Sequence, residues 1–166
     1  MTNVSDRFDR VPPTKSAQSD RGRPTRSEVV DYFEQRFEIS RDTFDNQSFW
    51  EKGAGKIWTF SGHAPDPLKV ESLGLPLLRT RQEHWKPTTN GVQRFGRGAT
   101  KNVLKLSALE GRKFLAGETQ QLKWDGDWGY LIISREIAGV NEPLGVGLYT
   151  HGELKSMMPK GRRRYR

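Results

Sequence analysis

An alternation of large and small side chains near the carboxyl terminus limits most strongly how this 166-residue chain can fold. Residues 144–149 read Leu-Gly-Val-Gly-Leu-Tyr, and a period of two residues is that of a β-strand. Residues 130–133 are an uninterrupted apolar run of strand length. Residues 150–152 then form a turn into a closing strand over 153–158. The carboxyl-terminal third of the chain is therefore predicted to be a β-sheet.

The rest of the chain predicts short helices and strands. Thr25 with Glu28, and Ser107 with Glu110, fit capping boxes at two helix starts. Helices are expected at 27–38, 86–96 and 107–116, and strands at 56–60, 70–85 and 103–106. This order, a helix followed by strands with small helices between them, predicts an α+β fold whose mixed sheet curls into a small barrel.

The candidate core is mostly aromatic. Residues with helical spacing in the first helix are expected to face inward, namely Val29, Val30, Phe33 and Phe37. The next core candidates are Phe44, Phe49 and Trp50. The tryptophans assigned to core or turn packing are Trp50, Trp58, Trp124 and Trp128.

Basic residues concentrate in three segments, although the net charge is only +8. Residues 1–26 carry six basic and three acidic side chains, residues 79–101 carry six and one, and residues 155–166 carry six and none. Localised cations create a field that can hold a polyanion. The alternative is that basic ends only keep the chain in solution. Tyr165 within the last segment adds a stacking surface, which favours nucleic acid.

The sequence gives no support for catalysis, a metal or a cofactor. With no cysteine, the chain lacks a thiol nucleophile, a disulfide and a thiolate metal site. Asp125 and Asp127 lie in a Gly-rich turn, and the Gly145-Val146-Gly147 sequence lies inside a strand rather than before a helix. We therefore expect a protein that is not an enzyme.

No apolar run reaches the roughly 20 residues that a membrane-spanning helix needs, and the amino terminus has no signal-peptide core. We expect a soluble cytoplasmic protein that does not contact a membrane. Nothing in the sequence indicates an obligate dimer, so we expect a monomer.

Three sequences near the carboxyl terminus resemble a known pattern. These are Pro143–Gly147, Gly152–Lys155 and Pro159–Arg163, which match the form "PLGxG, G-x-LK, PKG-x-R". The segment resembles the small PUA-like domain of the NOL1/NOP2/fmu group of ribosome biogenesis proteins, where it follows an RNA cytosine-5 methyltransferase. The Trp-Lys-Pro-Thr-Thr sequence of residues 85–89, followed by Phe95, is similar to a helix start of the same family. The matches span residues 75–164, and the first helix and the Trp58 strand are expected to belong to the same unit.

The resemblance implies a stand-alone RNA-binding domain with a PUA-like pseudobarrel. It does not imply the enzymatic half, because the chain has no room for a methyltransferase domain and lacks the cysteine nucleophile of cytosine-5 chemistry. We expect a disordered basic arm over 1–24, a PUA-like RNA-binding domain over 25–159 and a basic tail over 160–166.

The candidate RNA-binding residues come from the basic segments and the glycine strand. Lys86 at a helix start is expected to hold a phosphate, Trp85 could stack a base or belong to the core, and Gly145 and Gly147 would let an RNA backbone approach closely or mark a bend. The full set is Trp85, Lys86, Arg94, Arg97, Lys101, Gly145, Gly147, Lys155, Lys160, Arg162, Arg163 and Arg164.

Three hypotheses about function follow. The first is a non-catalytic, ribosome-associated protein that binds structured RNA, namely rRNA in a ribosomal subunit. The second is an RNA-binding accessory subunit of a separate RNA methyltransferase. The third, the weakest, is a small RNA-modifying enzyme with an unrecognised site.

Overall fold

The computed structural model describes residues 23–61 and 74–164, and all structural statements below concern these residues. The first part contains helix α2 (Arg26–Phe37), 3₁₀-helix η1 (Arg41–Phe44) and strands β1 (Gln47–Glu51), β2 (Lys56–Ser61), β3 (Leu75–Arg79) and β4 (Lys86–Pro87). Helices α3 (Thr89–Phe95) and η3 (Gly96–Gly98) follow. The second part contains β5 (Val103–Leu106), α4 (Ala108–Leu115), β6 (Gln120–Gln121), β7 (Gly129–Ile137), β8 (Val140–Thr150), β9 (Glu153–Ser156) and η4 (Lys160–Arg162).

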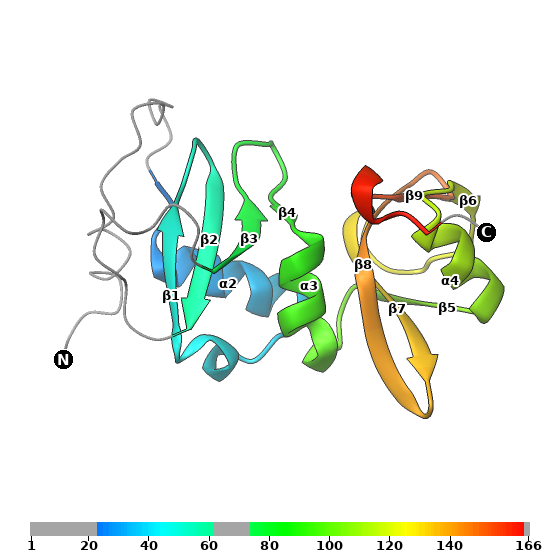
Figure 1. The fold of residues 1–166 in the computed structure, drawn as a ribbon, viewed down its shortest axis with the longest axis horizontal. Helices are drawn as coiled ribbons and strands as arrows, with labels where there is room; N and C mark the ends of the chain where they lie inside the picture. Colours follow the sequence, from blue (N-terminus) through cyan, green and yellow to red (C-terminus); the bar gives the residue numbers. More distant parts are fainter. Residues whose placement is uncertain (1–22, 62–73, 165–166) are drawn as a thin grey trace.

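Two sheets lie side by side along the molecule (Figure 1). The first is antiparallel, with strand order β1-β2-β3-β4. The second has the order β5-β7-β8-β9-β6, in which only β5 and β7 run parallel. A register shift in the β7–β8 pairing at Ile133 and Ser134 bends the long hairpin. The second sheet curls into a half-barrel, and the whole is a mixed α+β fold with few helices.

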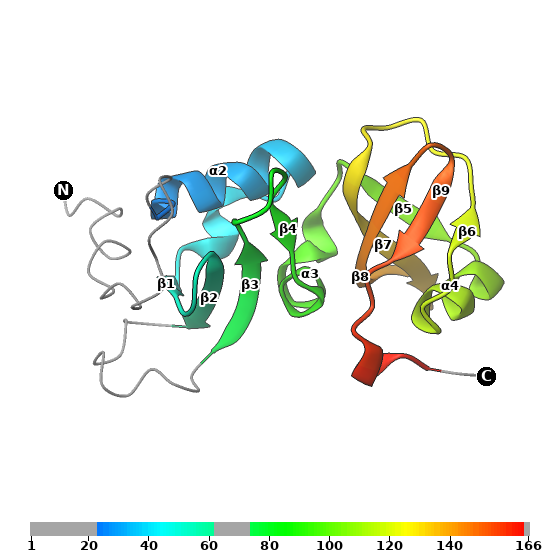
Figure 2. The ribbon, with the colours of Figure 1, turned by 90° about the horizontal axis from the view of Figure 1, so that it is seen from above.

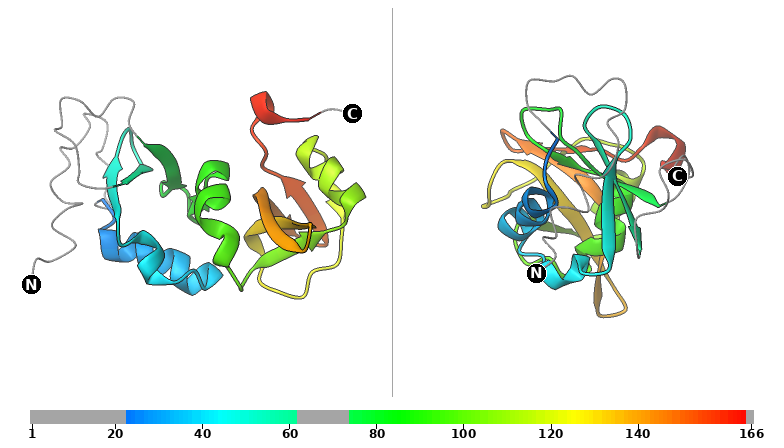
Figure 3. Two further views of the ribbon diagram at one scale, coloured as in Figure 1. Left: turned by 60° about the horizontal axis from the view of Figure 1, so that its bottom comes forward. Right: turned by 90° about the vertical axis from the view of Figure 1, so that its left-hand side faces the viewer.

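A shared core joins the two sheets. Phe33 and Phe37 of α2 belong to the same buried cluster as Ile57 of β2, Ile132 of β7 and Val146 of β8. A second cluster around Phe114 and Leu131 fills the half-barrel. Helix α3 lies between the two sheets (Figure 3, left). Buried apolar side chains therefore connect the two sheets directly.

The helix starts form as the capping signals predict. The Thr25 side chain accepts a hydrogen bond from the Glu28 N–H, although the Glu28 carboxylate contacts the Thr25 hydroxyl rather than its N–H. Ser107 and Glu110 form a complete capping box at α4. Thr88 caps α3 by accepting from the Gly91 N–H. The three expected helices are confirmed. The helix expected to start at Lys86 begins three residues later, at Thr89, and Lys86 lies in strand β4 rather than at a helix start.

One expected strand is shorter than predicted. The strand placed over 70–85 ends at Arg79, and Trp85 lies outside it, directly before β4. Residues 1–22, which contain most of the expected basic arm, residues 62–73, and residues 165–166, which include Tyr165 of the expected basic tail, lie outside the described residues. Within 23–61 and 74–164, no helix is long and apolar enough to span a membrane.

Candidate nucleic-acid interface

The carboxyl-terminal basic segment contacts helix α3. Arg162 Nη1 donates to Asn90 Oδ1 at 2.8 Å and Arg162 Nη2 donates to Gln93 Oε1 at 2.7 Å. Both acceptors are uncharged amides, so the guanidinium is fixed in place while its positive charge is not neutralised. A guanidinium carries five N–H groups, and these bonds use two of them. The remaining donors are suited to a phosphate.

Two further cations lie near this contact on the same elements. Arg94, on α3, and Lys160, on η4, are exposed, and neither forms an ion pair with any residue in the described part of the chain. We call the set Asn90, Gln93, Arg94, Lys160 and Arg162 the α3–η4 surface. It combines three uncompensated positive charges with fixed hydrogen-bond donors, which is the composition of a phosphate-binding surface.

Two other predicted residues are occupied by contacts within the protein. Arg97 forms an exposed ion pair with Glu142, with Nη2 and Oε2 2.8 Å apart. Lys101 Nζ donates to the Gln35 carbonyl of α2 at 3.3 Å. The charge of Arg97 is therefore partly compensated, while that of Lys101 is not.

Lys86 lies beside a second cation. Lys86 of β4 lies opposite Arg79 of β3 in the sheet register, and the Lys86 Nζ lies 5.7 Å from the centre of the Tyr130 ring. Burial first, and the charge of Arg79 second, lower the pKa of Lys86. Like charges on opposed residues of a sheet are unfavourable, so an anion bound between them would be stabilised. The N-terminus of α3 offers less than expected, because Thr88 already accepts from the Gly91 N–H.

The predicted basic residues lie on two sides of the molecule. Figure 2 shows α2 and η4 on opposite sides. Lys101 contacts α2, and Lys86 contacts Tyr130, whose carbonyl accepts from Arg36 of α2. The described basic residues of segments 79–101 and 155–164 therefore do not all lie on one face. The α3–η4 surface holds the tail and Arg94, while Lys86 and Lys101 lie toward α2.

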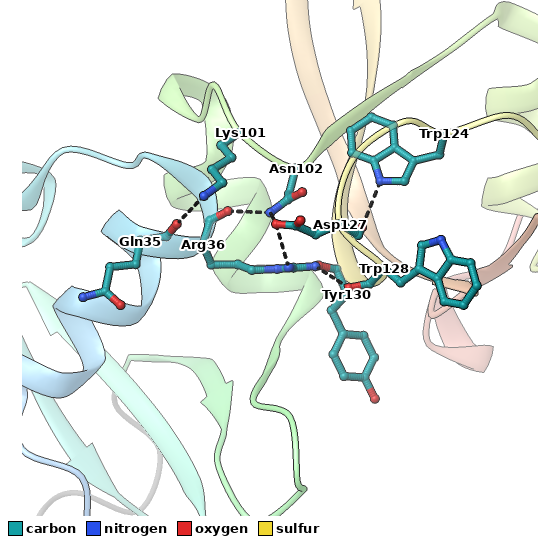
Figure 4. Close-up of polar contacts among 8 residues, drawn as sticks. All are labelled: Gln35, Arg36, Lys101, Asn102, Trp124, Asp127, Trp128 and Tyr130. Atoms are coloured by element: carbon teal, nitrogen blue, oxygen red, sulfur yellow. Dashed lines mark hydrogen bonds and ion pairs between the residues drawn. The ribbon is translucent and has the colours of Figure 1, made fainter. Parts of the chain in front are cut away.

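A polar network connects α2 to the second sheet (Figure 4). Arg36 donates to the carbonyls of Trp128 and Tyr130 and forms a 3.7 Å ion pair with Asp127. Asn102 Nδ2 donates to the Arg36 carbonyl at 2.9 Å and to Asp127 at 3.3 Å. Together with the shared core, this network fixes the positions of the basic residues relative to one another.

Gly145 and Gly147 are not open to a ligand in the structure. Both are buried inside the protein. A Cβ at Gly147 would lie 2.6 Å from Leu154 Cδ1 and 2.9 Å from Ile133 Cγ1, and one at Gly145 would lie 3.2 Å from Met158 Cε. The missing side chains therefore make room for neighbouring residues of the core, which favours a packing role for both glycines.

We expect Gly147→Ala to lower stability without acting on RNA. The added methyl group overpacks a buried site, which costs about 1–3 kcal/mol. Chemical denaturation should show this loss, while the RNA affinity of the folded fraction stays unchanged. A variant with wild-type stability and weaker RNA binding would contradict the packing role.

The other predicted residues contact the protein as follows. The ring of Trp85 is half-buried and lies 5.6 Å from that of Tyr32, so Trp85 packs on the core. Arg163 Nε donates to the Met158 carbonyl at 3.2 Å and lies against Gly117, while the Arg164 N–H donates to the Leu115 carbonyl. Lys155 is exposed on β9. The described part of the basic tail thus packs on α3 and α4.

Several residues of the site could not be found from the sequence. Asn90 and Gln93 are uncharged and gave no signal, and Arg79 belonged to a basic segment but was not singled out. Trp128 was assigned to core or turn packing, but 54% of it is exposed. Its position in a Gly-rich turn was the one available indication.

Two family models match separate parts of the chain. A family of unknown function, DUF7122, matches residues 1–74, and the methyltransferase RsmF PUA domain matches residues 101–164. No curated protein matches the chain.

The second match covers β5 to η4. Residues 101–164 therefore form a PUA-like domain related to the C-terminal domains of methyltransferases, and such a domain suggests RNA binding. The first helix and the Trp58 strand, which were expected to belong to the same unit, fall within the first match. The Trp-Lys-Pro-Thr-Thr sequence falls within neither.

Proposed function

We propose that this protein is a non-catalytic RNA-binding protein of the ribosome or of ribosome biogenesis, and that it binds structured rRNA through the α3–η4 surface. The observation that carries the proposal is Arg162, a guanidinium of the PUA-like domain that is held between two neutral amides of α3. Its charge stays available for a phosphate. We also propose that the protein is monomeric and cytoplasmic.

Structured RNA fits this surface better than DNA. Helix α3 has seven residues and buries Thr89, Gly91, Val92 and Phe95, so it cannot enter a major groove as a recognition helix does. Short basic elements on a small domain suit contacts to the phosphates and the shape of folded RNA. The proposal contains no catalytic step, because a chain without cysteine lacks the nucleophile of cytosine-5 chemistry.

The test is equilibrium binding to purified ribosomal subunits, rRNA and duplex DNA over a salt series. We expect RNA to bind more tightly than DNA, and one subunit to bind more tightly than the other. If several phosphates are contacted, affinity should fall by orders of magnitude between about 50 and 200 mM salt. Equal and weak binding to all of these, with little salt dependence, would contradict the proposal.

A second candidate is an RNA-binding accessory subunit of a separate RNA methyltransferase. The observation that favours it is the match to a PUA domain that is named for a methyltransferase. The candidate would be supported by a methyltransferase that still copurifies with the protein after ribonuclease treatment and that needs the protein to transfer methyl groups to RNA. Loss of the association on ribonuclease treatment would contradict it.

A further inference from the structure

Trp128 is the most exposed of the large apolar side chains in the described residues. It lies between β6 and β7 and is 54% exposed, compared with 45–49% for Leu109, Ile137 and Val140. An exposed indole contributes little to the stability of its own fold, because most of its apolar surface remains in water. Its exposed surface is therefore open to a ligand.

The backbone around Trp128 is held in place. Arg36 donates to the Trp128 carbonyl at 3.2 Å, and the Trp124 indole N–H donates to the Asp127 carbonyl at 2.9 Å. Figure 4 shows the Trp128 ring pointing away from Arg36 and Asn102, below the Trp124 ring. A side chain on a fixed backbone loses little further freedom when it binds, so this ring is prepared for a contact.

A second exposed ring lies against it. The rings of Trp128 and His151 are 4.7 Å apart at 53°. His151 occupies the β8–β9 turn with a φ of 52°, a conformation that costs energy for a residue other than glycine. The turn thus holds an imidazole beside the indole, and the two form an open aromatic surface.

Two cations are linked to this region through Tyr130. Lys86 contacts the ring of Tyr130, two residues along the chain from Trp128, and Arg79 lies opposite Lys86. Neither cation pairs with an acid in the described part of the chain. Asp127, directly before Trp128, would repel a phosphate at the ring itself. The arrangement offers a phosphate contact at Lys86 and Arg79 and an uncharged, flat contact at Trp128.

We propose that Trp128 and His151 stack an unpaired nucleobase of a bound RNA, while Lys86 and Arg79 contact the adjoining phosphates. The inference rests on the proposed RNA binding and assigns a second contact region, on the side opposite the α3–η4 surface. A flat aromatic face accepts any base, so the region selects unpaired RNA without selecting its sequence.

The test compares a labelled 12-nucleotide uridine RNA with a fully paired RNA duplex and purified rRNA, using the full chain. Trp128→Ala should weaken binding of the uridine RNA about tenfold or more and leave the duplex within about twofold. The salt dependence should not change, because stacking displaces no counterions. Trp128→Phe should retain most of the affinity, and Trp128→Leu, which keeps an apolar side chain without a π face, should not.

The matched control is Leu109→Ala, which removes another exposed apolar side chain and should change nothing. If Trp128→Ala does not fold, the comparison of Trp128→Phe with Trp128→Leu still tests whether an aromatic ring is needed at this position. Equal affinities of all variants for the uridine RNA would overturn the stacking proposal but not the proposed function. The same would follow if the wild-type protein bound rRNA but not the uridine RNA. Failure of wild-type protein to bind any of the RNAs would overturn the proposed function as well.

Discussion

Neutralising Arg94, Lys160 and Arg162 together, as glutamine, should weaken RNA binding on the order of 100-fold at about 0.15 M salt. Each of these cations is exposed and has no acidic partner among the described residues, so each is free to displace a counterion from a phosphate. Losing three such contacts should also lower the slope of log affinity against log salt by about two to three. Filter binding or fluorescence anisotropy over a salt series measures both effects.

The control for this variant removes the same charge elsewhere. Lys105 of β5, Arg112 of α4 and Lys123 of the β6–β7 loop are exposed and form no ion pair with described residues. Their triple replacement by glutamine changes the net charge equally and should weaken binding severalfold at most. Equal losses for the two triple variants would mean that net charge, and not the α3–η4 surface, holds the RNA. Point variants are preferable to a truncated tail, because Arg163 and Arg164 contribute packing contacts.

Phe33→Ala should lower the free energy of unfolding by about 3–5 kcal/mol, the usual cost of a cavity left by a buried phenylalanine. Phe33 is 1% exposed and its ring lies 5.4 Å from that of Phe44. Because its cluster also contains Ile132 and Val146, both sheets should lose stability together in one transition. Urea denaturation, with amide exchange of β7 and β8 followed in parallel, measures the effect.

The control is Phe33→Leu, which leaves a smaller gap and should cost about 1.5 kcal/mol or less. A different result would arise if the sheets were energetically independent. In that case the first sheet would unfold early in Phe33→Ala while the exchange of β7 and β8 stayed at the wild-type level. That outcome would contradict the shared core.

The local elements were predictable because their signals are local. Thr25, Thr88 and Ser107 cap helices by hydrogen bonds that span three residues. The alternation in the strand over 144–149 and the helical spacing of residues 29–37 are likewise periodic patterns that can be read from a few neighbouring residues. The PUA-like character of residues 101–164 was also available, through the glycine strand and the closing basic motif.

The basic residue types of the candidate site could be predicted from the sequence, but their arrangement in space could not. The Arg162 contact joins residues 72 positions apart in the chain, and its partner Asn90 is an ordinary polar residue. The side on which Lys101 lies depends on where α2 packs, which no local pattern encodes. Gly147 shows the converse problem: a glycine in a strand fits either a close ligand or a close neighbour, and only the packing of Leu154 and Ile133 decides.

The most direct test of the central claim, that RNA contacts the α3–η4 surface, is ultraviolet cross-linking of the full chain to rRNA, with the linked peptides identified by mass spectrometry. We expect cross-links in the peptides that contain Asn90–Arg94 and Lys160–Arg162, and we expect them to be lost on competition with unlabelled RNA and at high salt. Specific cross-links confined to other elements, with none on α3 or η4, would contradict the claim.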